Sequence, residues 1–185
     1  MKDNQITFPK HILLLFFLLL TGCQIFVSKD EPEIIQEPWE KLSIEKKIAQ
    51  MIMFRLKGDL TNDSSFEYKK FHRWINEIGI GGAVVYGGDL KETFERIQIA
   101  QSWSDIPLFI AADYERGLGQ WYDGATLFPT NMAVAATGRN ILAYEQGKIT
   151  AIEAKAFGVN MIFAPVMDVN NNPDNPIINF RSYGD

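Results

Sequence analysis

Three short runs of apolar residues constrain the fold of this chain more than any other feature of its sequence. They occupy residues 82–86 (GAVVY), 107–112 (PLFIAA) and 160–164 (NMIFA). Consecutive apolar residues over such a short length are typical of a strand that is buried on both faces of a sheet. Segments with helical periodicity separate the runs. This alternation predicts an α/β fold in which helices cover a parallel sheet.

The helical segments carry their own start and stop signals. Ser43 is a predicted N-cap, and four apolar residues after it share one helix face, which we expect to be covered. Residues 130–157 are predicted to be mostly helical, with breaks indicated at Gly138 and Gly147 and an end at Gly158. The apolar face of the first helix consists of Ile44, Ile48, Met51 and Ile52.

Two architectures fit a parallel sheet with helical connections: an open doubly wound sheet and a (β/α)8 TIM barrel. The nucleotide-binding form of the open sheet loses support, because the turn at Gly87 and Gly88 is not a G-x-G-x-x-G fingerprint. No G-x-x-x-x-G-K-[ST] motif occurs either. A complete barrel needs roughly 250 residues. We therefore predict a partial barrel, its N-terminal half, in residues 39–185.

The beginning of the chain has the layout of a bacterial lipoprotein signal peptide. Lys2 and Lys10 precede the uninterrupted apolar run 12–20. That run is much shorter than the roughly 20 residues that cross a bilayer, which disfavours a permanent transmembrane helix. The residues Leu-Thr-Gly before Cys23 resemble a lipobox. The resemblance implies that residues 1–22 are removed and that Cys23 receives a lipid.

The segment after Cys23 differs in composition from the rest of the chain. Residues 23–38 are acidic and contain two prolines, which indicates a solvated tether between a lipid and the domain that starts at Trp39. We expect a protein anchored by lipid in the bacterial cell envelope, at the outer membrane and facing either the periplasm or the surface. The alternative to a signal peptide is that the apolar run 12–20 forms a buried helix and that Cys23 follows it by chance.

Charge and composition exclude several classes of partner. The net charge is −5 and no run of Lys or Arg forms a basic patch, so we expect no nucleic-acid partner. A single cysteine cannot form an internal disulfide. His11 and His72 are the only histidines, so a histidine-rich metal site is not expected. We predict that the protein needs no metal and no organic cofactor.

Six stretches together resemble the N-terminal domain of glycoside hydrolase family 3, the family of bacterial β-N-acetylglucosaminidases and β-glucosidases. They run in the family's order and cover nearly all of the chain after Trp39. Each motif is weak alone, whereas six in order are specific. The stretches are residues 47–51 (KIAQM), 80–85 (IGGAVV), 106–115 (IPLFIAADYE), 128–133 (FPTNMA), 163–169 (FAPVMDV), and 175–178 with 181–184 (NPII, RSYG).

The resemblance implies a (β/α)8 barrel whose active site lies at the carboxyl ends of the strands. It also implies a retaining mechanism, in which an aspartate attacks the anomeric carbon and water later hydrolyses the glycosyl-enzyme. In the family that aspartate, a Lys-His motif that binds sugar hydroxyls, and the acid/base all follow the matched region. We therefore expect no catalytic residue up to Asp185, and no turnover by these residues alone.

Several polar residues match positions that bind sugar in the family. Asp113 follows a predicted strand, and the resemblance implies that it accepts hydrogen bonds from sugar hydroxyls; a loop cap is the alternative. Arg181 matches the arginine of the RSFG-type motif, and a salt bridge to a loop carboxylate is its alternative. Glu115 shares a face with Asp113 if the chain is extended, so it is a further candidate for substrate binding or for an acid/base pair. Asp168 precedes an asparagine-rich loop and is expected to be structural.

The sequence departs from the family where a second sugar contact is expected. The usual pattern is Asp-x-Glu-Gly-Gly-Arg-x-x-Arg, whereas residues 113–121 read DYERGLGQW. Trp121 therefore stands in place of an arginine. An indole can stack on the apolar face of a pyranose but supplies no fork of donors. Trp121 and Arg116 are both candidate substrate contacts, with Arg116 as the candidate replacement for the missing fork.

Three hypotheses about function follow. The first is the N-terminal part of a retaining β-glycosidase that releases terminal N-acetylglucosamine, with a β-glucosidase as the variant within the same family. The second is an inactive, lipid-anchored sugar-binding protein that keeps Asp113 and Arg181 but has no nucleophile. The third is a structural lipoprotein, which predicts that Asp113 and Arg181 do not converge in space.

Overall fold

A computed structural model describes residues 38–184, and its centre is a four-stranded parallel sheet. The strands lie side by side in the order in which they occur along the chain, and every neighbouring pair is parallel. An open doubly wound sheet reverses its strand order at a switch point, whereas a barrel does not. The strands are β1 (Met53–Arg55), β2 (Gly82–Val84), β3 (Phe109–Ala112) and β4 (Met161–Ile162).

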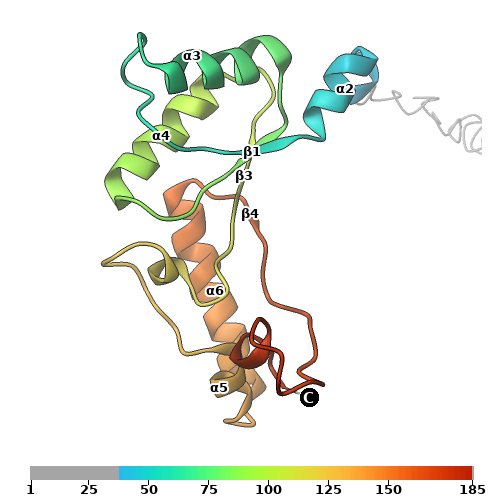
Figure 1. Cartoon of the computed structure of the whole chain (residues 1–185), viewed down its shortest axis with the longest axis vertical. Coiled ribbons are helices and arrows are strands. Elements are labelled where there is room, and N and C mark those ends of the chain that lie inside the picture. The colour runs from blue at the N-terminus through green and yellow to red at the C-terminus, as the bar shows by residue number, and fades with distance from the viewer. Residues whose placement is uncertain (1–37, 185) are drawn as a thin grey trace, which may run out of the picture. The chain divides into compact units, whose positions relative to one another are not determined.

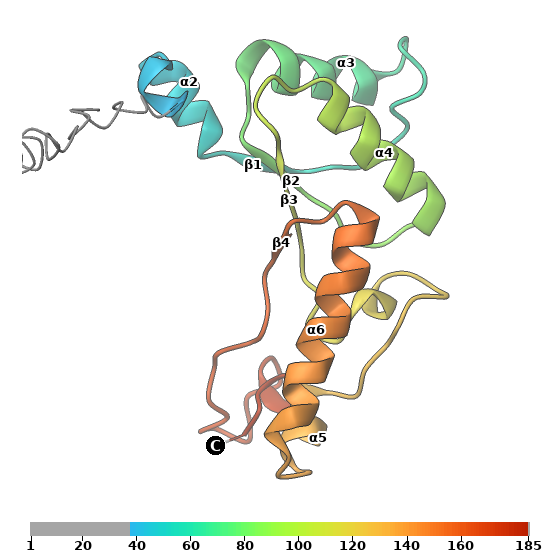
Figure 2. The same ribbon diagram turned by 180° about the vertical axis from the view of Figure 1, so that it is seen from behind.

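Helices α3, α4 and α6 lie on one side of the strands in both views of the ribbon (Figures 1 and 2). A π-helical segment continues α3, and short 3-10 segments accompany several loops. The helical elements are η1 (Pro38–Lys41), α2 (Ile44–Gln50), α3 (Phe66–His72), η2 (Arg73–Ile78), α4 (Leu90–Ser102), η3 (Leu118–Gln120), α5 (Asn131–Ala135), α6 (Asn140–Phe157) and η4 (Asn179–Arg181).

The two faces of the sheet have different environments. Alternate residues, such as Ala83 on β2 and Ile110 on β3, are fully buried and pack into the core with the helices. The residues between them point to the opposite face, where Phe109 on β3 is 55% exposed and Met161 on β4 is 36% exposed. The helix-covered face therefore holds the core. The other face corresponds to the interior of a barrel.

Two side-chain amides bind the amino end of β3. Gln101 of α4 donates to the carbonyl of Leu108 at 2.9 Å and accepts from its N–H at 3.0 Å. Asn160, just before β4, accepts from the N–H of Ile110 at 2.8 Å and donates to the carbonyl of Leu108 at 3.0 Å. These amides replace ladder bonds of the backbone and fix this end of the sheet.

The predicted fold class is confirmed, with one strand missed. All three apolar runs contain a strand of the parallel sheet, and four consecutive parallel neighbours form half of a (β/α)8 barrel. β1 was not predicted, because its residues 53–55 (MFR) include only two apolar positions and follow a helical pattern without a break. Only Phe54 of this strand is buried, at 8% exposure.

The outcome for the helices is mixed. Ser43 caps α2 as predicted, accepting from the N–H of Lys46. The expectation that the apolar face of α2 is covered is wrong for the described residues. Gly138 breaks the long helical segment as predicted, whereas Gly147 lies inside α6 and breaks nothing. The four residues of the α2 face, Ile44, Ile48, Met51 and Ile52, are between 47% and 84% exposed.

The predicted signal peptide, the lipid site at Cys23 and most of the tether (residues 23–38) lie outside the described residues. Residues Pro38–Asp185 form one unit by their internal contacts. Within the part that the structure describes, no helix has both the length and the apolar character that crossing a bilayer requires.

Candidate functional site

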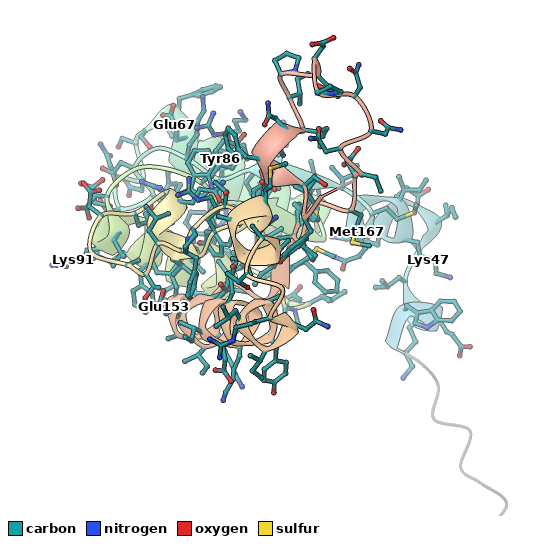
Figure 3. All side chains as sticks on the ribbon, turned by 90° about the horizontal axis from the view of Figure 1, so that it is seen from below. Lys47, Glu67, Tyr86, Lys91, Glu153 and Met167 are labelled. Atoms are coloured by element: carbon teal, nitrogen blue, oxygen red, sulfur yellow. The ribbon has the colours of Figure 1, made fainter. Side chains whose placement is uncertain are left out.

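The predicted site residues gather at the carboxyl ends of the parallel strands. Asp113 directly follows β3, and its neighbour Tyr114 is buried in the core with 2% exposure. The alternation of an extended chain therefore turns Asp113 toward the interior face of the sheet. Arg181 reaches the same end from η4, far along the sequence. Figure 3 looks onto this end of the molecule, with Tyr86 and Met167 among the labelled residues.

Glu115 and Arg181 form a forked ion pair. The Nε of Arg181 donates to one carboxylate oxygen of Glu115 at 3.0 Å, and Nη2 donates to the other at 2.6 Å. Nη1 donates to the carbonyl of Ile177 at 3.2 Å. The side chain of Glu115 is 11% exposed and that of Arg181 is 39% exposed. The carboxylate is therefore largely occupied by the guanidinium, whose remaining N–H groups face more open space.

The carboxylate of Glu115 dominates the electrostatic surroundings of Arg181. The pKa of Arg181 is raised above the ordinary value, first by the hydrogen bonds from its guanidinium to Glu115 and against the opposing effect of burial. The negative charges of Glu115, Asp168 and Asp113 add to the increase. Arg181 is bonded to Glu115, which is two residues after Asp113, so Arg181 and Asp113 belong to the same end of the sheet. The hypothesis of a purely structural lipoprotein does not predict this placement.

A buried amide network holds the backbone on both sides of this ion pair, and sequence reasoning missed its role. Gln146 of α6 donates to the carbonyl of Glu115 at 3.0 Å and to the side-chain oxygen of Asn131 at 3.3 Å. Asn131 in turn donates to the carbonyl of Arg181 at 2.8 Å. Both amides are nearly inaccessible, at 6% and 1% exposure. Asn131 belongs to the FPTNMA stretch, which was the one clue in the sequence.

The loop after β4 is tied to the segment that carries Arg181. Ser182, which is 1% exposed, donates its hydroxyl to the carbonyl of Asp168 at 2.7 Å. Asp168 itself is exposed, and its backbone rather than its side chain makes this contact. A structural role for the side chain of Asp168 stays a prediction.

Trp121 lies beside Asp113. Its indole N–H donates to the backbone carbonyl of Asp113 at 2.9 Å. The ring also packs against the turn after β2, because a Cβ on Gly87 would lie 3.9 Å from the indole. Trp121 remains 37% exposed. The indole is therefore fixed at the rim of the sheet and still accessible to a ligand.

Arg116 is engaged in its own loop. Its Nε donates to the carbonyl of Phe128 at 3.0 Å, and its backbone N–H donates to the side chain of Gln120 at 3.1 Å. Gly117 follows with a positive φ of 82°, and an added Cβ would meet the carbonyl of Thr126 at 2.5 Å. These contacts fasten the loop that carries Trp121. A direct sugar contact by Arg116 stays a prediction.

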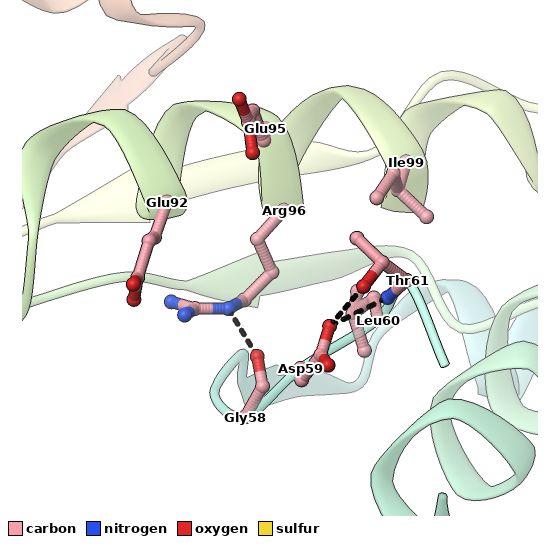
Figure 4. A pocket seen from close by; sticks show the side chains of 8 residues that line it. All are labelled: Gly58, Asp59, Leu60, Thr61, Glu92, Glu95, Arg96 and Ile99. Atoms are coloured by element: carbon pink, nitrogen blue, oxygen red, sulfur yellow. Dashed lines mark hydrogen bonds between the residues drawn. The ribbon is translucent and has the colours of Figure 1, made fainter. Parts of the chain in front are cut away.

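A separate hollow of about 520 Å³ lies between the loop after β1 and α4 (Figure 4). Arg96 donates its Nε to the carbonyl of Gly58 at 2.6 Å. Asp59 accepts from both the backbone N–H and the hydroxyl of Thr61, each at 2.7 Å. Arg96 and Asp59 therefore bind other residues of this hollow. None of the residues predicted for the sugar site lines it.

The carboxylate of Glu115 is directed at the guanidinium of Arg181. Across positions 38–184, no group of three or more His, Cys, Asp and Glu side chains is arranged to hold a metal ion.

Comparison with known proteins gives a consistent picture. The sequence profile of the glycosyl hydrolase family 3 N-terminal domain matches residues 43–185. A β-hexosaminidase A from Pseudoalteromonas piscicida is 36% identical over 124 residues, which cover 60% of this chain and 21% of the relative. A β-N-acetylglucosaminidase/β-glucosidase from Cellulomonas fimi is 34% identical over 165 residues, which cover 89% of this chain and 28% of the relative.

A solved structure shows the same fold. A β-glucoside phosphorylase, BglX, bound to 2FGlc superposes with a TM-score of 0.65 at 30% sequence identity. The superposition covers 78% of this chain and 25% of that structure. The chain thus spans about a quarter of the length of each of these three proteins.

Proposed function

Because the chain belongs to glycosyl hydrolase family 3, we propose that it forms the N-terminal part of a retaining β-glycosidase that releases terminal N-acetylglucosamine. The name of the C. fimi relative supports an N-acetylated sugar, and the name of the P. piscicida relative supports a hexosaminide. The name of the C. fimi relative also includes β-glucosidase, so glucose is the alternative substrate in this proposal.

One observation carries the proposal: the convergence of Asp113 and the Glu115–Arg181 pair at the carboxyl end of a parallel sheet. The carboxylate of Asp113 can accept hydrogen bonds from neighbouring sugar hydroxyls, and bonds to a charged acceptor are about twice as strong as neutral ones. The N–H groups of Arg181 that Glu115 and Ile177 leave unused can donate to the same ring. Donors and acceptors thus face one polyhydroxyl ligand.

In this proposal the described residues bind and orient the sugar. The carboxylate that attacks the anomeric carbon and the acid/base are expected beyond Asp185, as the family resemblance implies. Binding energy at Asp113 and Arg181 then fixes the ring relative to those groups, which is a recognised source of rate enhancement. No cofactor enters the proposed reaction.

The alternative sugar is favoured by one feature of this chain. Trp121 occupies the position of an arginine that contacts the sugar in the acetylglucosaminidase branch of the family, and an indole cannot supply the paired donors of a guanidinium. The loss of that contact favours glucose over N-acetylglucosamine. Comparing the two sugars in one experiment therefore tests the substrate choice directly.

The test is isothermal titration of the purified protein with N-acetylglucosamine and with glucose. We expect N-acetylglucosamine to bind more tightly, and Asp113→Asn to weaken its binding at least tenfold. Asp123→Asn is the matched control, because Asp123 is exposed on the loop after η3. Tighter binding of glucose would select the alternative. Binding that Asp113→Asn leaves unchanged, or no binding of either sugar by the folded protein, would contradict the proposal.

We further propose that the protein is held at a bacterial membrane by a lipid on Cys23. The lipobox-like residues before Cys23 and the acidic segment after it support this placement. A lipid anchor keeps a domain at the membrane surface without a spanning helix.

A further inference from the structure

The ion pair between Glu115 and Arg181 is one half of a closed ring of contacts. The two side chains, 66 positions apart in the sequence, bond to each other through the fork. The other half is the amide relay, which consists of Gln146 and Asn131. Gln146 donates to the backbone carbonyl of Glu115 at 3.0 Å and to the side-chain oxygen of Asn131 at 3.3 Å. Asn131 donates to the backbone carbonyl of Arg181 at 2.8 Å, so each partner of the ion pair is held by its side chain and by its backbone.

The two ends of the amide relay fix the direction of its hydrogen bonds. A backbone carbonyl can only accept, so an amide bonded to it has to present its nitrogen. At the carbonyl of Arg181 that amide belongs to Asn131, whose oxygen then faces Gln146. Gln146 consequently presents its nitrogen to Asn131 and to the carbonyl of Glu115. A carboxylate or an apolar side chain at either position would interrupt the relay.

Two helices hold the amide relay in place. Asn131 is the first residue of α5, and Thr130 caps this helix by accepting from the N–H of Ala133. Gln146 belongs to α6. Asn131 is 1% exposed and Gln146 is 6% exposed, so a carbonyl that lost its bond to the relay would be left without a partner at a cost in free energy. The relay therefore ties the segment that follows β3 to η4.

The ion pair alone constrains the guanidinium less than the complete ring does. The side chain of Arg181 is 39% exposed, and holding a long side chain of this exposure in one geometry costs conformational entropy. The fork forms only when two donors are aligned with two carboxylate oxygens. That alignment depends on the spacing between the backbone of Glu115 and the backbone of Arg181, which the amide relay sets.

We propose that Gln146 and Asn131 are positioning residues of the sugar site. By fixing the backbone at both partners of the ion pair, they hold the guanidinium of Arg181 in the orientation in which its unused N–H groups face the sugar. This inference rests on the proposed sugar site and adds residues that act on it without touching the ligand.

The test interrupts the relay and follows Arg181 directly. Gln146→Met keeps an unbranched side chain of similar length but has no donor. The Nε–H of Arg181 reports the fork in nitrogen-15 NMR spectra, because it donates to Glu115 at 3.0 Å, and its signal is identified by its loss in Arg181→Gln. We expect hydrogen exchange of this N–H to become about tenfold faster in Gln146→Met, the change that loss of one hydrogen bond implies. The Kd of N-acetylglucosamine, measured by isothermal titration, should rise by a similar factor. Asn131→Ala interrupts the other end of the relay and should give the same two changes.

Gln101→Met is the matched control. Gln101 also binds backbone groups with its side-chain amide, but it does so at Leu108, at the opposite end of β3. Its loss should therefore lower the free energy of unfolding while leaving both the exchange rate of the Arg181 Nε–H and the Kd of the sugar unchanged. Circular dichroism of each variant establishes that it is folded.

The outcomes separate this inference from the proposed function. If folded Gln146→Met and Asn131→Ala keep the original exchange rate or the original Kd, the positioning role is refuted and the sugar site stands. Equal changes in Gln101→Met also refute it, because a general loss of stability then explains them. If the exchange rate responds as expected but the unaltered protein binds no sugar, the proposed function fails, whereas the hold of the relay on Arg181 is supported.

Discussion

Replacing Glu115 with glutamine tests whether this residue positions Arg181. Glutamine keeps one carbonyl that can accept from the guanidinium, but its amide places a second donor against the donors of Arg181. The variant therefore loses the charge and one arm of the fork. The bonds at stake span 3.0 Å and 2.6 Å.

The burial of Glu115 and Arg181 determines how much stability the variant should lose. Exposed ion pairs contribute about 0–1 kcal/mol, and breaking a buried pair costs about 3–5 kcal/mol. Glu115 is 11% exposed, but Arg181 is 39% exposed and is screened by water. We therefore expect a loss of about 2 kcal/mol in the free energy of unfolding, between these limits. A loosened Arg181 should also weaken N-acetylglucosamine binding about tenfold, the equivalent of about 1.4 kcal/mol.

The assay combines urea denaturation, followed by circular dichroism, with isothermal titration of the sugar. Glu77→Gln is the control, because Glu77 pairs with Arg73 at 3.8 Å and both side chains are largely exposed. A double-mutant cycle with Arg181→Gln isolates the coupling between Glu115 and Arg181. If Glu115→Gln costs no more than Glu77→Gln and the coupling is within about 0.5 kcal/mol of zero, the positioning role is refuted.

Three further predictions concern stability and location. Gly81→Ala should lower the free energy of unfolding by about 3 kcal/mol or more, because the added Cβ would clash with the backbone carbonyl of Gln50. Gly147→Ala lies in open space on α6 and should raise the free energy of unfolding by about 0.5–1 kcal/mol. Thermal melts of both variants measure the two changes. Burial raises the pKa of Tyr114, so the unfolded chain loses its phenolic proton first and stability should fall as pH rises above about 10. Tyr114→Phe should flatten that fall; an unchanged slope would exclude the tyrosine as its cause. Cys23→Ser should move the protein from the membrane fraction to the soluble fraction, and retention at the membrane would rule out the lipid anchor.

The sequence predicted the parts of the fold that depend on local pattern. Residues 82–86, 107–112 and 160–164 are apolar or nearly so throughout, and each contains a strand of the parallel sheet. β1 was not predicted, because Arg55 does not belong to the core and the strand is therefore not apolar throughout. The exposed face of α2 was expected to be covered, since periodicity reports which residues share a face but not whether another element lies against it.

Only part of the candidate site could be predicted from the sequence. Asp113 and Arg181 could be named because they match positions in a recognised motif. Their convergence depends on the register of β3 and on the path of η4, and neither can be read from residue types. The role of Gln146 had no local signature, because a glutamine on a helix usually faces solvent and only the packing of α6 against Glu115 buries it.

The side-chain amides of Gln101 and Asn160 secure β3 at the end of the sheet that lies farthest from Asp113. Their bonds to Leu108 and Ile110 do not depend on the identity of the side chains at the opposite end. A substitution at Trp121, which loses the bond from its indole to the carbonyl of Asp113, should therefore loosen one end of β3 and leave the other end in place.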